Sequence, residues 1–558
     1  MHLSRSQALR DLETTPFDLC IVGGGATGAG CALDAQLRGL RTALVEAADF
    51  ASHTSSASTK MAHGGIRYLQ LAARRFDFRQ YRLVRHALRE RAVMLRNAPH
   101  LARPLEFLAP CFSLPELSYY GLGLKLYDRV AGRDRLAPSH ILPAGEALRR
   151  LPRLRPENLR GAVSYADGQF DDARYALALV TTFVEAGGCA LNYAYVTGFE
   201  RAPGGQIAAA AVEDRISGGV FPIRARAFVN ATGPFSDRLR RLASPAAPPR
   251  LRPSKGVHIL FPLDHWGSDS LLVPKTEDGR VVFAIPYHGR LLVGTTEDPA
   301  SPDAEMLVTR SEIDYLLRQI NPYLNRPLAA ADVVSGFAGL RPLVSSRSAG
   351  NTSRLIRDDE VEVDASSGLV SILGGKWTTY RLMAERTIDR VQSILGIPVG
   401  DCVTASKPLA GAEPLTDAQV RALTERFGFD TARRLARRYG SRARALARLA
   451  EESADLSRPL IAGAPPLRAE VVYAARHEMA RTVEDVLARR TALQLYDWRL
   501  AIQAAPEAAR LMAPELNWSP EEIASAAETY IQTTTRLLQA ATQNSELKTD
   551  NSKLTTEN

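Results

Sequence analysis

The feature that most constrains the fold of this chain is a glycine-rich turn near its start, set between two short apolar segments. Residues 17–22, FDLCIV, have the continuous apolar character of a buried strand, and Gly23, Gly25 and Gly28 follow with the spacing G-x-G-x-x-G. A helix rich in small residues then leads to a second strand, which ends at Glu46. This order of strand, glycine turn, helix, strand and acid predicts a dinucleotide-binding unit.

Each residue of the unit has a physical role in binding a dinucleotide. Gly23 permits the tight turn, Gly25 lets the main chain approach a pyrophosphate, and Gly28 lets the helix pack closely on the strand. The helix N-terminus presents unpaired N–H groups and a positive dipole end to the phosphates. Glu46 can accept hydrogen bonds from an adenosine ribose, and its charge would repel a 2′-phosphate.

The middle of the chain predicts a mixed α/β region. The segment 172–188 has a helical pattern that ends in a glycine pair. Strands are expected over residues 189–196, 227–231, 256–262, 281–287 and 290–296, and again before the glycines at 374–375. Because glycines recur where predicted strands end, at Gly23, Gly233 and Gly374, we expect distant segments to converge on one extended ligand.

The fold class that these patterns predict is α/β (α+β). A Rossmann-like domain is expected to be interwoven with a mixed-sheet substrate domain, and an all-helical domain follows toward the C-terminus. Residues 1–15 are predicted to be an N-terminal extension, and 16–403 the two interwoven domains. Residues 404–540 are predicted to be the helical domain, and 541–558 a disordered tail without apolar periodicity.

Composition limits the class of protein. The five cysteines are scattered without C-x-x-C spacing, which argues against a zinc site or a disulfide framework and fits a reducing compartment. No apolar run approaches the ~18 residues of a membrane-spanning helix, and the N-terminus lacks the apolar run of a secretory signal. The net charge of +9 is uneven, because the segment 74–96 is rich in arginine. That segment is either a solvated helix face or a surface attracted to lipid headgroups or nucleic acid.

The residues after the second strand favour FAD over NAD as the dinucleotide. TSSASTK (54–60) follows that strand almost directly, and its clustered hydroxyl and N–H groups can hold an elongated pyrophosphate–ribityl chain. NATG (230–233) and GGKWTT (374–379) would then close on the same ligand from later parts of the chain.

Seven motifs occur in an order that resembles a known family. After the glycine turn with Glu46 come TSSASTKMAHGGIRYL (54–69), DGQFDDARYALA (167–178), NATGPFSD (230–237), KGVHILF (255–261), GLRPLV (339–344) and GGKWTTYRLMAE (374–385). Together they resemble the FAD-dependent glycerol-3-phosphate dehydrogenase/oxidase family, within the D-amino-acid-oxidase-like flavoproteins. HEMARTVEDVLARRT (477–491) resembles that family's helical C-terminal domain, and the resemblance covers roughly residues 16–535.

The resemblance implies FAD as the cofactor and no metal. The residues implied to bind FAD are Gly23, Gly25, Gly28, Glu46, Thr54, Ser55, Ser58, His63, Gly64, Val196, Gly233, Gly375 and Thr378. The segment 54–60 is expected to lie along the cofactor, and 63–65 to pass the isoalloxazine ring, where glycine lets the main chain pack on a flat ring.

The resemblance also implies a site for sn-glycerol 3-phosphate. The catalytic residues that it implies are His258, Arg341 and Lys376, and the substrate-binding residues are Arg67, Tyr68 and Arg357. Arginine suits a phosphate because its planar fork makes paired, charge-assisted hydrogen bonds.

Alternatives stay open at several of these positions. Arg357 is followed by three acids and can instead form a surface salt bridge. His258 is flanked by apolar residues and can be a core histidine; as the base for the C2 hydroxyl it competes with Lys376 and Tyr68. Arg341 is expected to stabilise a developing alkoxide and the reduced flavin. Lys376 is expected to hold the negative edge of the flavin, to bind phosphate, or both.

The reaction implied is oxidation of sn-glycerol 3-phosphate to dihydroxyacetone phosphate, with hydride transfer to FAD and electrons passed to ubiquinone or menaquinone. The expected location is cytoplasmic, with peripheral binding to the anionic inner face of the cell membrane. A homodimer is a possible assembly, and nucleic acid is not an expected partner.

Four other functions are alternatives. Two are close relatives: an oxygen-using glycerophosphate oxidase, and an amine or amino-acid oxidase of the same fold. A non-catalytic flavin-binding paralogue is the third. The fourth is an RNA-modifying flavoprotein, although the sequence has no paired catalytic cysteines and no aromatic-rich basic strand for stacking bases.

Overall fold

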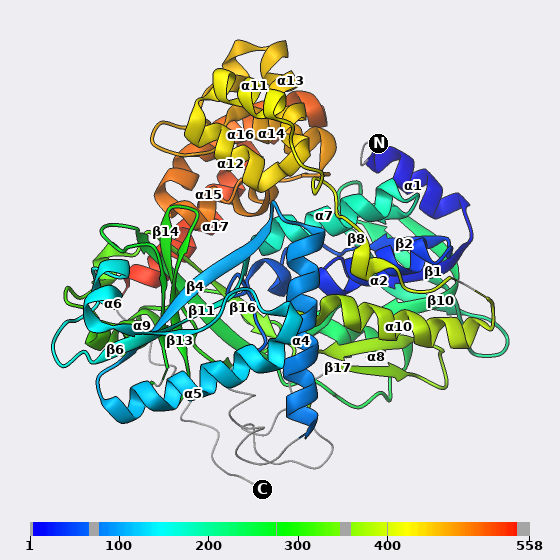
Figure 1. The fold of residues 1–558 in the computed structure, drawn as a ribbon. Coiled ribbons are helices and arrows are strands. Elements are labelled where there is room, and N and C mark those ends of the chain that lie inside the picture. Colours follow the sequence, from blue (N-terminus) through cyan, green and yellow to red (C-terminus); the bar gives the residue numbers. More distant parts are fainter. Residues whose placement is uncertain (1–3, 66–77, 275, 346–358, 399, 544–558) are drawn as a thin grey trace, which may run out of the picture.

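The computed structural model describes residues 4–65, 78–274, 276–345, 359–398 and 400–543 (Figure 1). Two β-sheets lie side by side, and a group of C-terminal helices, yellow to red in Figure 1, lies above them. None of the helices within these ranges combines the length and apolar character that a bilayer crossing requires.

The first sheet has a parallel centre with the strand order β18–β10–β1–β2–β7. Its strands are β1 (Phe17–Val22), β2 (Thr42–Val45), β7 (Cys189–Leu191), β10 (Val220–Asn230) and β18 (Val370–Gly374), with β17 (Asp359–Val363), β8 (Ala194–Arg201) and β9 (Ile207–Asp214) added antiparallel. The apolar run FDLCIV forms β1 at the middle of this sheet, as expected for a parallel strand covered on both faces.

Three helices cover the parallel strands. Helix α2 (Ala26–Leu37) lies between α7 (Asp172–Glu185) and α10 (Tyr380–Leu395), and their apolar faces join the strands in one core. Because parallel strands end at the same edge of a sheet, the turns that follow β1, β10 and β18 meet there. The prediction that distant glycine turns converge is confirmed.

The second sheet is mixed and mostly antiparallel, with the order β15–β11–β14–β13–β12–β4–β6–β3, β16 beside β11, and β5 beside β6. Its strands are β3 (Met61–Ala62), β4 (Ala102–Cys111), β5 (His140–Pro143), β6 (Gly161–Phe170), β11 (Ser254–Pro262), β12 (Ser270–Val273), β13 (Val282–Tyr287), β14 (Arg290–Gly294), β15 (Asp298–Pro299) and β16 (Ser335–Arg341). One face packs on α6 (Ala144–Arg150) and α9 (Arg310–Ile320). We call TSSASTK (54–60) the hydroxyl-rich segment. The short strand β3 follows it directly, so this segment leads from the first sheet to the second.

Of two long helices, α5 (Leu114–Ala131) lies at the lower side of the molecule in Figure 1, and α4 (Phe78–Asn97) runs upright from the middle to the lower edge. They contact each other through a small apolar cluster that contains Val84, Leu88 and Tyr127. The arginine-rich segment of the sequence is therefore largely helix α4.

The C-terminal region is helical, as predicted. It contains α11 (Asp417–Phe427), α12 (Phe429–Tyr439), α13 (Ala443–Glu452), α14 (Arg468–His477), a π-helical turn (Asp485–Arg490), α15 (Leu493–Tyr496), α16 (Trp498–Leu516) and α17 (Pro520–Thr542). These helices have their own core of leucine and alanine side chains. Trp498 and Ala541 also join the core beside the second sheet, so the helical region is docked on that sheet. The domain boundaries proposed from the sequence stay predictions.

One sequence prediction needs correction, and both ends of the chain add detail. Residues 189–196 were expected to form one strand, but the chain breaks at Asn192 and Tyr193, because the buried Asn192 side chain donates to Met479 O and Asp49, and Tyr193 has a φ of 55°. The N-terminal extension contains a helix, α1 (Arg5–Thr14), which buries Leu12 against the first sheet. Of the predicted tail, residues 541–542 end α17, and 544–558 lie outside the described residues.

Candidate active site

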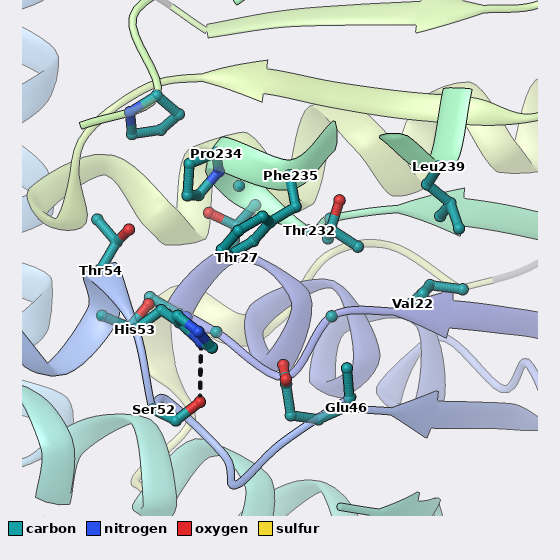
Figure 2. A pocket seen from close by; sticks show the side chains of 18 of the residues that line it. Val22, Thr27, Glu46, Ser52, His53, Thr54, Thr232, Pro234, Phe235 and Leu239 are labelled. Atoms are coloured by element: carbon teal, nitrogen blue, oxygen red, sulfur yellow. Dashed lines mark hydrogen bonds between the residues drawn. The ribbon is translucent and has the colours of Figure 1, made fainter. Parts of the chain in front are cut away.

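An elongated cavity of about 430 Å³ lies at the edge where β1, β2, β10 and β18 end (Figure 2). Its walls contain the glycine turn, the segment after β2, the start of β8 and the turns after β10 and β18. Figure 2 shows Val22, Thr27 and Glu46 on one side and Thr232, Pro234 and Phe235 on the other. The predicted cofactor residues on its wall are Gly23, Gly25, Glu46, Thr54, Ser55, Val196, Gly233 and Gly375.

The glycines of the turn pack so closely on other residues of the cavity wall that a side chain would collide there. Gly23 has a φ of 113°, and a Cβ there would lie 2.6 Å from Ala231 O. A Cβ on Gly25 would lie 2.9 Å from the hydroxyl oxygen of Ser55. Gly25 is also the residue before α2, and Gly25, Ala26 and Thr27 line the cavity, so the N-terminus of α2 adjoins it. Within this first turn, Ala26 N donates to the Ser55 hydroxyl (2.9 Å).

The carboxylate of Glu46 lies at the cavity wall and is held by the main chain. One oxygen accepts a hydrogen bond from Gly24 N (2.6 Å) and the other from Ala48 N (3.0 Å). At the same end of the cavity, the Arg215 guanidinium lies 4.1 Å above the ring of Tyr195. A carboxylate for a ribose, a planar wall beside it and a helix N-terminus fit the adenosine and pyrophosphate parts of FAD.

Several cavity residues were not predicted from the sequence. His53 and Phe235 meet edge to face with ring centroids 5.1 Å apart, and Figure 2 shows them approaching from opposite sides. Arg238 lies 5.5 Å from the centre of the Phe235 ring. Both Phe235 and Arg238 lie within or next to the NATGPFSD motif, so extending the prediction along that motif would have found them.

Other predicted cofactor residues lie away from this cavity and have partners of their own. The Ser58 hydroxyl donates to Asp172 (2.7 Å). His63 N donates to the hydroxyl of Thr378 (3.2 Å), and Gly64 N donates to the hydroxyl of Tyr127 (2.8 Å).

Gly28 packs helix α2 against the turn, because a Cβ there would collide with Gly23 O. A role of Gly28 toward a cofactor stays a prediction.

The turn after β18 forms part of the cavity wall. Gly375, Lys376 and Trp377 line the cavity together with Pro342. Trp377 Nε1 donates to Ser55 O (2.8 Å), which fixes this turn against TSSASTK (54–60). Lys376 therefore lines the same cavity as Glu46 and comes from a distant part of the chain.

A face of the second sheet carries two of the predicted catalytic residues. In the register of β11 and β16, His258 lies opposite Phe337, and Ser254 lies opposite Arg341. Because side chains alternate along a strand, His258 and Arg341 share one face. Arg341 donates to the Thr295 hydroxyl (2.8 Å) and to Thr296 O (3.2 Å). Pro342, on the cavity wall, follows Arg341 directly, so this face adjoins the cavity.

The environment of His258 holds its imidazole neutral. The residue is only 2% exposed, and its ring stacks on Phe337 with centroids 4.8 Å apart. Nε2 lies 3.0 Å from the hydroxyl oxygen of Thr59. Burial lowers the pKa of His258 well below its ordinary value, and the charges of Arg341 and Lys60 lower the pKa further.

Lys60 forms a buried ion pair that anchors the hydroxyl-rich segment. Its ammonium lies 2.7 Å from Asp172 and donates to Ser56 O (2.6 Å). Neither side chain is more than 1% exposed. The ammonium also lies 4.7 Å from the centre of the Phe337 ring, on which His258 stacks. Nothing in the local sequence pattern marks this pair, because its members are far apart in the chain.

Three predicted substrate residues, Arg67, Tyr68 and Arg357, lie outside the described residues. The roles assigned to all predicted site residues stay predictions. Within the described ranges, no group of three or more His, Cys, Asp or Glu side chains is arranged to hold a metal ion.

The chain matches two family models that together cover most of its length. The model described as FAD dependent oxidoreductase matches residues 18–381, and the model described as C-terminal domain of alpha-glycerophosphate oxidase matches residues 402–523. The probable mitochondrial glycerol-3-phosphate dehydrogenase of Caenorhabditis elegans is 42% identical over 517 residues, which are 91% of this chain and 71% of that protein. The mitochondrial glycerol-3-phosphate dehydrogenase of Homo sapiens is 38% identical over 542 residues, which are 94% of this chain and 74% of that protein.

Solved structures agree with these matches. The glycerol-3-phosphate dehydrogenase of Bacillus halodurans, complexed with FAD, is 32% identical, with a TM-score of 0.77, and the match covers 96% of this chain and 97% of that one. The glycine oxidase of Geobacillus kaustophilus is 21% identical with a TM-score of 0.51, which shows a shared fold.

Proposed function

The chain belongs to the family of FAD-dependent glycerol-3-phosphate dehydrogenases, and from this premise we propose that it oxidises sn-glycerol 3-phosphate to dihydroxyacetone phosphate. The observation that carries the proposal is identity of 38–42% with proteins of that name over more than nine-tenths of the chain. The chain is a flavoprotein oxidoreductase, and FAD when bound supplies the acceptor for two electrons and the C2 hydrogen.

The fixed positive charge of Arg341, next to the cavity residue Pro342, supports this chemistry. Arg341 is held by Thr295 and Thr296, so its guanidinium is fixed before any substrate arrives. Such a preorganised cation stabilises negative charge that develops on a substrate oxygen. We propose that Arg67 and Arg357 complete the phosphate clamp, since paired guanidinium bonds suit a dianion.

His258 is the proposed base for the C2 hydroxyl proton. Its lowered pKa keeps the imidazole neutral, and a neutral imidazole can accept a proton. Lys376 lines the FAD cavity. We propose that its charge serves the negative edge of the cofactor.

For the electron acceptor we propose a quinone. The relatives with the highest identity reported above are named dehydrogenases, which favours an acceptor other than oxygen. A steady-state assay with purified holoenzyme decides the matter: we expect glycerol 3-phosphate oxidation with a short-chain ubiquinone or menaquinone, and little hydrogen peroxide from oxygen. Rapid peroxide formation without quinone would make the enzyme an oxidase.

We also propose that the protein binds the surface of an anionic bilayer, and that helices α4 and α5 make the contact. Helix α5 and its surroundings expose large apolar side chains to solvent, namely Leu114, Tyr119, Leu122, Leu126, Ile141, Phe78 and Tyr81. Exposed cations flank them on the same two helices: Arg82, Arg85, Arg89, Lys125 and Arg129. Apolar side chains beside cations are what an anionic lipid surface attracts.

The membrane proposal has a matched test. Leu122 on α5 is 76% exposed, and Phe429 on α12 is 67% exposed in the helical region. We expect Leu122→Ser to weaken cosedimentation with vesicles that contain anionic phospholipid, and Phe429→Ser to leave it unchanged. Equal binding by both variants would remove α5 from the interface. The homodimer is tested separately by sedimentation equilibrium.

The amine-oxidase alternative is tested with the same purified protein. Its substrate would need one cation for a carboxylate and no phosphate clamp. Turnover of glycine, sarcosine or a D-amino acid, together with no turnover of glycerol 3-phosphate, would replace the proposed function.

A further inference from the structure

We propose that the hydroxyl of Thr59 relays the C2 hydroxyl proton of the substrate to His258, so that His258 acts without touching the substrate. The proposal rests on the proposed function and adds a catalytic residue to it. A base must lie within hydrogen-bond reach of the proton that it accepts, but the imidazole of His258 is enclosed by other parts of the protein.

The imidazole of His258 is enclosed on its faces. Phe337 stacks on the ring at an interplanar angle of 14°. Strand β14 passes so close that a Cβ on Gly294 would collide with the ring. With 2% of the residue exposed, a substrate has almost no direct access to either nitrogen.

Among the described residues, Thr59 is the hydrogen-bond partner of this enclosed ring. Its hydroxyl oxygen lies 3.0 Å from His258 Nε2. Nδ1 of His258 is buried and has no hydrogen-bond partner among the described residues. Thr59 itself is half-buried. A proton can therefore reach the imidazole through the threonine hydroxyl.

The residues on both sides of Thr59 hold it in place. Ser58 donates to Asp172 through its main-chain N–H (3.0 Å) and its hydroxyl (2.7 Å), and the Lys60 ammonium pairs with the other oxygen of Asp172 (2.7 Å). Because these bonds are buried, the hydroxyl of Thr59 is presented in a fixed position. A hydroxyl has one hydrogen and two lone pairs, so a bond to Nε2 leaves a lone pair for a substrate hydroxyl.

The step balances as follows. The substrate O–H bond breaks and its proton passes to the Thr59 oxygen, while the Thr59 proton passes to His258 Nε2. The C2–H bond breaks with its electron pair passing to the FAD, and the electrons of the O–H bond form the second bond of the ketone. Thr59 ends as a neutral hydroxyl, and His258 holds the proton until solvent removes it.

The charges of Arg341 and Lys60 act on the proton acceptor, His258, and on the proton donor, the substrate hydroxyl. Their charges disfavour a proton on His258, which lies beside them. The same charges favour loss of the proton from a substrate oxygen, since they stabilise the alkoxide that remains. The dianionic substrate adds negative charge beside these cations and so offsets part of their effect on His258.

The test compares variants of Thr59 in the holoenzyme. Thr59→Val removes the hydroxyl and keeps the shape, and Thr59→Ser keeps a hydroxyl. The control Ser393→Ala removes an exposed hydroxyl of α10 that donates to Asp389 O. We measure the anaerobic rate of FAD reduction by glycerol 3-phosphate in H₂O and in D₂O. General acid–base catalysis contributes about 10²–10⁴-fold. We therefore expect Thr59→Val to slow reduction by about 100-fold or more and to change the solvent isotope effect, with Thr59→Ser and Ser393→Ala close to the parent.

A second measurement does not depend on activity. We record ¹⁵N NMR spectra of histidine-labelled protein, with His258→Asn to assign the signal. Thr59→Val should change the protonation and tautomer signals of His258, while Thr59→Ser and Ser393→Ala should not.

Coupling between the two residues provides the decisive comparison. Because Thr59 acts through His258, the double variant Thr59→Val/His258→Asn should be no slower than His258→Asn alone. Reduction of Thr59→Val at the parent rate, or effects of the two variants that multiply, would overturn the relay. If glycerol 3-phosphate does not reduce even the parent enzyme, the proposed function fails instead.

Discussion

Removal of Arg490 should show that the helical region holds part of the FAD site in place. Asp49 follows Glu46 by three residues and is fully buried, as is Arg490. Arg490 donates to both oxygens of Asp49, one of these bonds being 2.9 Å long, and to Glu478 O (2.7 Å). Arg489 adds a bond of 2.6 Å from its Nε to Asp49. The π-helical turn of the C-terminal region is thus tied to the segment that follows β2.

The magnitude follows from the burial of the pair. Removing one member of a buried ion pair costs about 3–5 kcal/mol, because the other charge stays buried without compensation. Arg489 still bonds Asp49 in the variant Arg490→Met, so we expect the lower end, about 3 kcal/mol. At 1.4 kcal/mol per factor of ten, this is about 100-fold in an equilibrium constant. Because Glu46 lies on the same segment, we expect the FAD dissociation constant to rise by up to that factor.

The assay is fluorescence titration of apoprotein with FAD, combined with thermal release of bound FAD. Arg510→Met is the control, because Arg510 is 57% exposed and its pair with Glu507 should contribute about 0–1 kcal/mol. The double variant Asp49→Asn/Arg490→Met should recover part of the loss, since it leaves no excess charge. Equal FAD affinity of Arg490→Met and Arg510→Met would refute the reasoning. So would a double variant whose loss of FAD binding free energy equals the sum of the losses of Asp49→Asn and Arg490→Met.

Three further predictions follow from the structure. Burial raises the pKa of Asp49, but Arg490 and Arg489 outweigh it and hold the pKa below its ordinary value. The stability that this pair contributes is therefore present above about pH 4 and lost as pH falls through the folded pKa, so urea unfolding of the parent and of Arg490→Met should converge in acid. Gly25→Val should abolish FAD binding while the circular dichroism spectrum stays native, because even a Cβ at this position lies 2.9 Å from the Ser55 oxygen. A variant that still binds FAD would contradict the role of this glycine turn in FAD binding. The acidic limb of kcat/KM should lie below pH 6.5, because the pKa of His258 is lowered, and a limb above pH 7 would exclude His258 as the base.

The glycine turn shows how far local pattern predicts this fold. An apolar strand followed by Gly23 and Gly25 fixes a turn and a helix start through short-range sterics, so the unit was predictable from the sequence alone. The convergence of Gly233 and Gly374 on the same edge followed from the direction of parallel strands. The order of motifs then pointed to the family, which the comparisons show.

The ion pairs were not predictable, because tertiary packing selects their partners. Lys60 and Asp172, like Asp49 and Arg490, are far apart in the chain and carry no local signal. Ser58 illustrates the same limit within one segment. Its hydroxyl donates to Asp172, a partner that the local pattern did not indicate, because a buried carboxylate needs hydrogen-bond donors. The predicted contact of Ser58 with FAD stays a prediction.

The most direct test of the central claim is an anaerobic titration of the purified holoenzyme with sn-glycerol 3-phosphate, followed by flavin absorbance. The account predicts that the visible absorbance of oxidised FAD is lost on adding this substrate, that dihydroxyacetone phosphate forms in equal amount to the reduced flavin, and that glycerol and amino acids cause no loss. Flavin that stays oxidised with glycerol 3-phosphate, or a protein that cannot be loaded with FAD, would contradict it.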